Sequence, residues 1–492
     1  MKSQLYLCSI LLTLLDACQS VPIKQITLVE AAPATSVPKP VEQILNELGF
    51  SDQEVGYAVF DLEKKQFVAI KNPDRSFLPA SVNKLGATLA ALNILGANYR
   101  FRTTLSYRGK IKSGLLVGDL YLKGNGDPML TISNLMDLAL QLRRRGIQNV
   151  SGHFYYDATF LPHQTMINES FEVDAPYNSG ISALSAEFNR FRLRWQPSSQ
   201  PGTLNATIIP ASPALHVSRS LQGQQFSYSS EGDQETWTLP LNLRREGERE
   251  LPVKNASRYT AGLFANLAHS IGLTLPSPEE GMQPATAMTL ATHESEPLLK
   301  LVKADLEYSN NLMTELFVLQ SGHKLSGKTL SLVDSVAKIT TWLKTSLTGV
   351  NWDGYKAENG SGLSPNDRLT PAQAVGILNW ADGLLWGGES YMTLLPVSGY
   401  RGTLRERLTA PDLAFRVWAK TGTINYGSGL AGYFLSSTNH KFSFALFLSD
   451  FEKRRLVDQV PPDQFAVKNV DGWIERARKA QDSILSKWIL DH

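Results

Sequence analysis

Ser81 and Lys84 stand three positions apart, directly before a run of small apolar residues at 85–92. In a helix this spacing places both side chains on one face, one turn apart. A serine hydroxyl is a poor nucleophile at its own pKa and needs a base beside it. A lysine can be that base when burial or a second cation lowers its pKa, and the apolar flank predicts burial. Ser81 and Lys84 are therefore a candidate nucleophile and base.

The order of motifs distinguishes Ser81 from other serines. The same Ser-x-x-Lys spacing occurs at three further positions, Ser36, Ser321 and Ser335. Only Ser81 follows a predicted strand pair, opens an apolar helix and precedes both Ser309-Asn310-Asn311 and Lys420-Thr421-Gly422-Thr423. Each motif alone is weak, but the three in this order form a specific pattern.

The sequence lacks the residues that other hydrolytic mechanisms need. There is no Gly-x-Ser-x-Gly elbow, and the eight histidines show no His-Glu-x-x-His or paired ligand spacing. Both cysteines, Cys8 and Cys18, lie near the N-terminus, which leaves the body of the chain without thiolate chemistry. We expect no metal and no cofactor. The net charge of +2 argues against a nucleic-acid partner, which would require a concentrated basic surface.

The N-terminus has the features of an export signal. Lys2 precedes an apolar run at 5–15, about the length of a signal-peptide core and too short to cross a bilayer. We assign residues 1–18 to this signal and the Pro- and Ala-rich segment 19–40 to a flexible tether. Leu15-Asp16-Ala17-Cys18 also resembles a lipoprotein cleavage box, so a soluble form and a form lipidated at Cys18 both stay open.

The remaining chain is long enough for more than one folded part. Its 492 residues suggest about three domains, or one large domain with insertions. We divide it into a first catalytic part at 41–100, an inserted α/β part at 101–187, an inserted β-rich part at 188–254 and a second catalytic part at 255–492. The main predicted elements are helices at 41–48, 132–145, 297–319, 330–345 and 473–490 and strands at 55–62, 66–70, 415–420, 429–435 and 442–448.

The three ordered motifs resemble those of the class C low-molecular-mass penicillin-binding proteins, the D-alanyl-D-alanine carboxypeptidase/endopeptidase family. Further segments support the resemblance, which spans about 41–490: 122–128, 177–178, 182–185, 360–364, 395–399 and 430–433. It implies an α/β (α+β) chain with the penicillin-binding, β-lactamase-like transpeptidase fold. In that fold an antiparallel sheet has helices on both faces, a helical subdomain adjoins it, and smaller inserted domains interrupt the chain.

The resemblance also implies roles for the residues of the motifs. Ser81 attacks the carbonyl between two D-alanines and forms an acyl-enzyme, while Lys84 accepts its proton. Ser309 passes that proton to the leaving amine, and Asn311 holds the substrate amide. The terminal carboxylate is bound by the segment that ends the predicted strand at 415–420, namely Lys420, Thr421, Gly422 and Thr423. The N–H groups of Ser81 and Thr423 form the oxyanion hole, and the Lys420 cation lowers the pKa of Lys84.

Substrate preference is less well defined. Asp157 matches a position that faces the amino group of the peptide's diamino acid in related proteins, but it could equally be a turn aspartate at a strand end. Asn359 stands where the family often has aspartate, and Pro365 where arginine is common. A site with a clamp on the side-chain carboxylate of the diamino acid and a site without one therefore both stay open.

The expected partners are peptidoglycan stem peptides and β-lactam antibiotics, with D,D-carboxypeptidase and D,D-endopeptidase cleavage both open. The expected location is the periplasm, free or tethered to the outer membrane through Cys18. Two alternatives share the fold: a serine β-lactamase or esterase, and a penicillin-binding sensor without turnover.

Overall fold

The computed structural model describes residues 39–199, 203–232, 234–460 and 468–492. The predicted signal at 1–18, with Cys18, and nearly all of the predicted tether lie outside these residues. None of the helices within the described ranges is long and apolar enough to span a bilayer.

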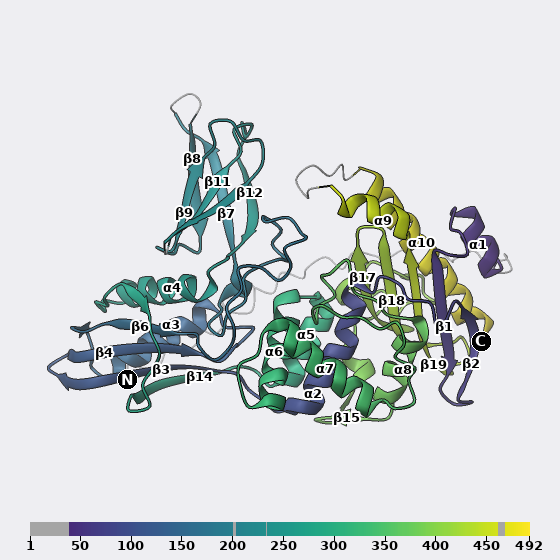
Figure 1. Ribbon diagram of the computed structural model, residues 1–492, viewed down its shortest axis with the longest axis horizontal. Helices are drawn as coiled ribbons and strands as arrows, with labels where there is room; N and C mark the ends of the chain where they lie inside the picture. The colour runs from purple at the N-terminus through teal and green to yellow at the C-terminus, as the bar shows by residue number, and fades with distance from the viewer. Residues whose placement is uncertain (1–38, 200–202, 233, 461–467) are drawn as a thin grey trace, which may run out of the picture. The chain divides into compact units, whose positions relative to one another are not determined.

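A five-stranded antiparallel sheet forms the centre of the fold, in the order β17-β18-β19-β1-β2 (Figure 1). The strands are β1 (Val55–Asp61), β2 (Gln66–Lys71), β17 (Val417–Ile424), β18 (Gly427–Leu435) and β19 (Lys441–Ser449). β18 and β19 are buried along nearly their whole length, which explains their continuous apolar sequence. The chain thus pairs β1, near the start of the described residues, with β19, near their end.

Helices cover both faces of this sheet. Ala431 and Tyr433 of β18 face one core, together with α2 (Lys84–Leu95), α6 (Asn311–Ser326) and α8 (Pro371–Ala381). Leu430 and Phe434, on the alternate positions, face a second core with α1 (Val41–Glu47) and α10 (Lys468–Asp491). This alternation follows from the two-residue period of a strand. It confirms the predicted sheet with helices on both faces.

The predicted helix at 297–319 is wrong as a single element. It consists of α5 (Leu298–Tyr308) and α6, which are separated at Ser309 and Asn310. Ser309 adopts a left-handed conformation with φ 58°, and the side chain of Asn310 accepts a hydrogen bond from the N–H of Met313 to start α6. The apolar pattern runs through the break, so the capping asparagine was its one local signal.

A second sheet has the order β13-β6-β4-β3-β14, with β5 beside β4. It contains the inserted strands β3 (Arg102–Lys112), β4 (Leu115–Gly124), β5 (Asn149–Val150) and β6 (Phe154–Asp157), and the later strands β13 (Pro278–Glu280) and β14 (Met288–Glu294). Helices α3 (Ile132–Arg144) and α4 (Ala256–Ser270) share its core. Residues 256–294, which we assigned to the second catalytic part, therefore complete the inserted sheet instead.

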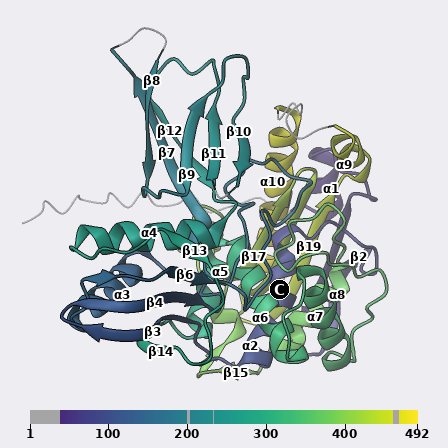
Figure 2. The ribbon, with the colours of Figure 1, turned by 60° about the vertical axis from the view of Figure 1, so that its left-hand side comes forward.

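The segment between α3 and α4 is rich in strands, as the alternating sequence at 188–254 indicates (Figure 2). It forms two three-stranded sheets, β12-β7-β8 and β10-β11-β9. The strands are β7 (Arg190–Pro197), β8 (Leu204–Ile209), β9 (Leu215–Arg219), β10 (Ser227–Glu231), β11 (Gln234–Leu239) and β12 (Gly247–Pro252). Phe191 and Trp237 are buried between them.

Shorter elements complete the described chain. They are α7 (Leu332–Ser346), α9 (Phe451–Asp458), β15 (Leu385–Trp386), β16 (Glu389–Ser390) and the 3₁₀ turns η1 (Ala80–Asn83), η2 (Glu187–Asn189), η3 (Tyr391–Leu394) and η4 (Gly402–Leu404).

Candidate active site

Ser81 lies on the turn η1, which leads directly into α2. Two glycines allow other segments to approach this turn. A Cβ on Gly422 of β17 would lie 2.3 Å from the carbonyl oxygen of Pro79, and one on Gly362 would lie 1.8 Å from that of Ala80. Ala80 itself has φ 43°, a strained value for a residue with a side chain. The turn before Ser81 is thus held between the edge strand of the sheet and the loop at 359–364.

Lys84 is fully buried at the first position of α2. Its Nζ donates hydrogen bonds to Oδ1 of Asn311 over 2.8 Å and to the carbonyl oxygen of Ser361 over 3.0 Å. Three segments far apart in the sequence therefore meet at one ammonium group. The structure brings Lys84 and Asn311 together as the motif order predicted.

Burial lowers the pKa of Lys84 to about 8, although the carboxylates of Asp305, Glu315 and Asp367 act in the opposite direction. A lysine with a pKa of about 8 is neutral in about a tenth of the molecules at pH 7, far more than an ordinary lysine, and can act as a general base. Burial is the main cause. The repulsion between the two ammonium groups of Lys84 and Lys420 also lowers the pKa of Lys420.

Lys420 and Ser309 form the second charged contact of the site. The Nζ of Lys420, on β17, donates to Oγ of Ser309 over 2.9 Å and to the carbonyl oxygen of Thr421 over 2.8 Å. Burial first, and the charge of Lys84 second, lower the pKa of Lys420 to about 7. The left-handed conformation of Ser309 places its hydroxyl at this lysine.

Asn311 contacts two parts of the chain through one amide. Its Oδ1 accepts from Lys84, and its Nδ2 donates to the carbonyl oxygen of Tyr177 over 3.1 Å. The second N–H of Nδ2 is the one available for a substrate carbonyl. Tyr177 acts here through its backbone carbonyl. The family resemblance includes the segment 177–178 but assigned it no role.

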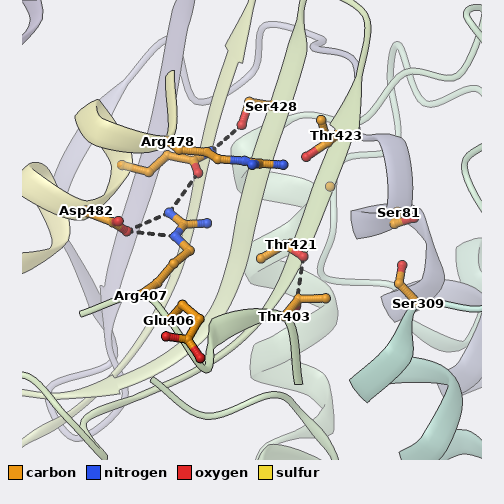
Figure 3. A pocket seen from close by; sticks show the side chains of 12 residues that line it. Ser81, Ser309, Thr403, Glu406, Arg407, Thr421, Thr423, Ser428, Arg478 and Asp482 are labelled. Carbon is orange, nitrogen blue, oxygen red and sulfur yellow. Dashed lines mark hydrogen bonds and ion pairs between the residues drawn. The ribbon is translucent and has the colours of Figure 1, made fainter. Parts of the chain in front are cut away.

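Two cavities meet at Ser81, Ser309 and Thr423. The larger has a volume of about 560 Å³ and extends past Thr421 to α10 (Figure 3). The smaller, about 300 Å³, is also lined by Tyr177 and Asn311. Ser81, the candidate nucleophile, therefore lies where the two cavities join.

Thr421, Gly422 and Thr423 line the larger cavity from the edge strand β17. Oγ1 of Thr421 donates to Oγ1 of Thr403 over 2.9 Å, and Thr423 is exposed. Lys420 lines neither cavity and is fully buried beneath Ser309. Lys420 therefore does not reach a carboxylate in the cavity directly, contrary to what the resemblance implied. The hydroxyls of Thr421 and Thr423 are the groups that can bind it.

Two buried carboxylates that the sequence analysis missed support the lysines. Glu315 accepts from the backbone N–H of Gly360 over 2.9 Å and of Ser361 over 2.8 Å, and so fixes the carbonyl group that binds Lys84. Asp305 accepts from Oγ1 of Thr314 over 2.7 Å, and burial raises its pKa to about 6. Single acidic residues within helices carry no pattern that separates them from surface acids.

Asn359 explains one departure from the expected pattern. Its Oδ1 accepts from the N–H groups of Gly362 and Leu363, each over 2.9 Å, and its Nδ2 donates to the carbonyl oxygen of Leu363 over 2.8 Å. An aspartate could accept the first two bonds but could not donate the third. Asparagine thus closes the loop beside Ser81 with one more hydrogen bond.

Asp157 lies at the end of β6, in the inserted sheet, and lines neither cavity at Ser81. Its carboxylate accepts from the N–H and hydroxyl of Thr159 and from the N–H of Gln283, and it pairs with Lys123 at 3.1 Å. These contacts favour the interpretation as a turn aspartate over a role in substrate binding.

Comparisons with known proteins identify the family. Residues 37–466 match the model of the D-Ala-D-Ala carboxypeptidase 3 (S13) family. The chain belongs to this family. It is 26% identical to a D-alanyl-D-alanine carboxypeptidase of Actinomadura sp. (strain R39), over 85% of this chain and 83% of the relative. It is 24% identical to D-alanyl-D-alanine carboxypeptidase DacB of Haemophilus influenzae, over 81% and 85% of the two chains.

Solved structures agree on the fold. Penicillin-binding protein 4 (dacB) from Haemophilus influenzae superimposes with a TM-score of 0.75 at 20% sequence identity, covering 91% of this chain and 99% of the other. The same protein complexed with a β-lactam gives a TM-score of 0.70 at 21% identity, over 90% and 99% of the two chains. The predicted family and the penicillin-binding fold are therefore confirmed.

Proposed function

We propose that this chain is a serine D,D-peptidase that removes the terminal D-alanine of peptidoglycan peptides through an acyl-enzyme on Ser81 and also cleaves D-alanyl–diamino acid cross-links. One observation carries the proposal: a fully buried lysine, Lys84, is held by Asn311 one turn from a serine at the junction of two cavities. Membership of the S13 family supports the same reaction.

In the proposed acylation step, Oγ of Ser81 attacks the carbonyl carbon between the two D-alanines while neutral Lys84 takes its proton. The pKa of about 8 leaves enough neutral amine for this transfer. The bond to the second D-alanine then breaks, and its nitrogen leaves as an amine. Ser309 relays the proton to that nitrogen because its hydroxyl faces the cavity and touches the Lys420 ammonium.

The remaining groups hold the substrate. The hydroxyls of Thr421 and Thr423 bind the terminal carboxylate, and the free N–H of Asn311 binds the peptide carbonyl on the acyl side. The backbone N–H groups of Ser81 and Thr423 form the proposed oxyanion hole. Loss of one such donor typically raises the barrier by about 3 kcal/mol. Water then releases the acyl group from Ser81.

Two incubations test the proposal. The mature protein is mixed with labelled penicillin and, separately, with a pentapeptide that ends in D-Ala-D-Ala. A lasting adduct on Ser81 together with released D-alanine supports the peptidase. Rapid turnover of penicillin would instead indicate a β-lactamase, and an adduct without peptide hydrolysis would indicate a sensor.

We also propose export to the periplasm, with the mature chain either free or anchored to the outer membrane through Cys18. The apolar run at 5–15 and the cysteine that follows it support this proposal. Labelled palmitate fed to expressing cells tests the anchor, with Cys18→Ala as the control. Label in the wild type and none in the variant supports lipidation, and no label in either indicates the soluble form.

A further inference from the structure

The larger cavity extends well beyond the groups that would bind one amino acid. From Ser81 it passes Thr421 and Thr423 and reaches the side chains of α10, with a volume of about 560 Å³. Pockets that hold ligands much larger than an alanine have volumes of about 300–1,000 Å³. Because the proposed carboxylate-binding Thr421 lines this cavity and not the smaller one, the larger cavity lies on the side of the leaving group.

One cation at the far end of this cavity, Arg478, has no partner among the residues that the structure describes. Arg407 donates from Nε and Nη2 to Oδ1 of Asp482, so these two charges cancel. Glu406 pairs with Arg405 at 3.4 Å. The carboxylate four residues along α10 from Arg478 is that of Asp482, and its Oδ1 binds Arg407 instead. Within residues 39–199, 203–232, 234–460 and 468–492, Arg478 makes no hydrogen bond or ion pair.

The side chain of Arg478 extends from α10 toward Thr423 (Figure 3). Its guanidinium can therefore reach an anion in the larger cavity beyond the one that the threonines bind. The neighbouring contact between Gln481 Nε2 and Ser428 Oγ, at 3.1 Å, fixes this part of α10 against β18. A free guanidinium on a fixed helix suits a second carboxylate, which it can bind through two parallel hydrogen bonds.

We propose that Arg478 forms a subsite for a second carboxylate of the leaving peptide, so that the larger cavity accepts a peptide cross-link as well as a terminal D-alanine. This inference rests on the proposed function. Cleavage at a terminal D-alanine releases an amino acid with a single carboxylate. Cleavage at a D-alanyl–diamino acid cross-link releases a peptide whose first carboxylate takes the place at the threonines and whose further carboxylates lie beyond it.

The test compares two substrates on Arg478→Gln: a D-Ala-D-Ala pentapeptide and a soluble cross-linked dimer of two stem tetrapeptides. For the dimer we expect kcat/KM to fall about 10-fold, the effect of one charge-assisted hydrogen-bonded contact. For the pentapeptide we expect a change of less than about twofold, because only screened long-range attraction is lost. Arg478→Lys should recover part of the dimer activity, since it keeps the charge but not the fork.

Two controls make the test specific. Lys479→Gln removes a charge from the next residue of α10, which does not line the cavity, and should leave both substrates unaffected. A dimer in which the first leaving-side carboxylate is kept and the further ones are converted to amides should be cleaved equally well by the wild type and by Arg478→Gln.

The outcomes separate this inference from the proposed function. Equal losses on both substrates, or no loss on the dimer, would overturn the subsite. A wild type that cleaves the pentapeptide but not the dimer would also overturn it while the carboxypeptidase stands. A wild type that is acylated by penicillin on no serine and cleaves neither substrate would overturn the proposed function itself.

Discussion

The Nζ of Lys420 donates a hydrogen bond to Oγ of Ser309 over 2.9 Å and so joins the edge strand of the central sheet to the break between α5 and α6. The contact depends on the left-handed conformation of Ser309, because a continuous helix would direct that hydroxyl elsewhere. Lys84 and Asn311 make the matching contact one residue after the break. The interruption of one predicted helix thus positions Ser309 and Asn311, the two residues of the Ser309-Asn310-Asn311 motif that contact the lysines.

The first prediction concerns the nucleophile. Ser81→Ala should abolish covalent labelling by penicillin, because the acyl group would have no oxygen to bind. Intact-protein mass spectrometry measures the adduct. Ser335→Ala is the matched control, since Ser335 begins another Ser-x-x-Lys sequence but is buried in α7. Labelling that survives in Ser81→Ala would place the nucleophile elsewhere.

The second prediction concerns pH. The pKa values of about 7 for Lys420 and about 8 for Lys84 indicate that the pair keeps a single proton between these pH values. Acylation needs a free amine and is faster when the second lysine is a cation, so its rate should rise as pH passes about 7 and fall above about 8.

The variant Lys420→Met tests which lysine causes the rise of the acylation rate with pH. In Lys420→Met the remaining ammonium is that of Lys84, so the midpoint of the rise should move to about pH 8 and the fall should disappear. The rate of penicillin acylation, followed by mass spectrometry from pH 5 to 10, measures both changes. Lys441→Met, at the start of β19, is the control. An unchanged midpoint in Lys420→Met would exclude coupling between the two lysines.

The sequence predicted which polar side chains of the site lie together, but not which residues line the larger cavity. Serine, lysine and asparagine types at fixed spacing predicted which side chains meet, because the reaction restricts them to a few arrangements. The larger cavity is bounded by Arg407 and Arg478, which come from a loop and from α10. Neither has a neighbour in sequence that marks it, so only the packing of α10 on the sheet reveals them.

Local sequence patterns also did not show where the inserted region ends. Strand β14 pairs with β3, residue His293 opposite Thr103, across the whole β-rich insertion. A pairing of such separation leaves no local signal, and the helical pattern of α4 resembles that of the catalytic part. Asp157 illustrates the reverse case, in which a family position predicts a binding role but the local hydrogen bonds at Thr159 are those of a turn.

The third prediction concerns Asp305. Its charge raises the pKa of both Lys84 and Lys420, so Asp305→Asn should lower both values and move the rising limb of acylation below about pH 7. Asparagine keeps the size of the side chain and can still accept from Thr314. Asp137→Asn, exposed on α3, is the control and should leave the profile unchanged. A profile of Asp305→Asn that matches the wild type would show that Asp305 only joins α5 to α6.

The fourth prediction concerns the glycine that faces the nucleophile turn. Gly362 has φ +81°, and a Cβ there would lie 1.8 Å from the carbonyl oxygen of Ala80. Gly362→Ala should lose about 1–2 kcal/mol of unfolding free energy from backbone strain alone, and displacement of the turn before Ser81 should slow acylation at least about tenfold.

Chemical denaturation and penicillin labelling measure the two effects of Gly362→Ala separately. Gly349→Ala is the matched control, because no atom lies within 4 Å of its added Cβ and its φ is not positive. That variant should stay within about 0.5 kcal/mol of the wild type. If Gly362→Ala lost stability yet kept full acylation, the loop at 359–364 would not position Ser81. The close approach of Gly362 to Ala80 would then serve folding alone.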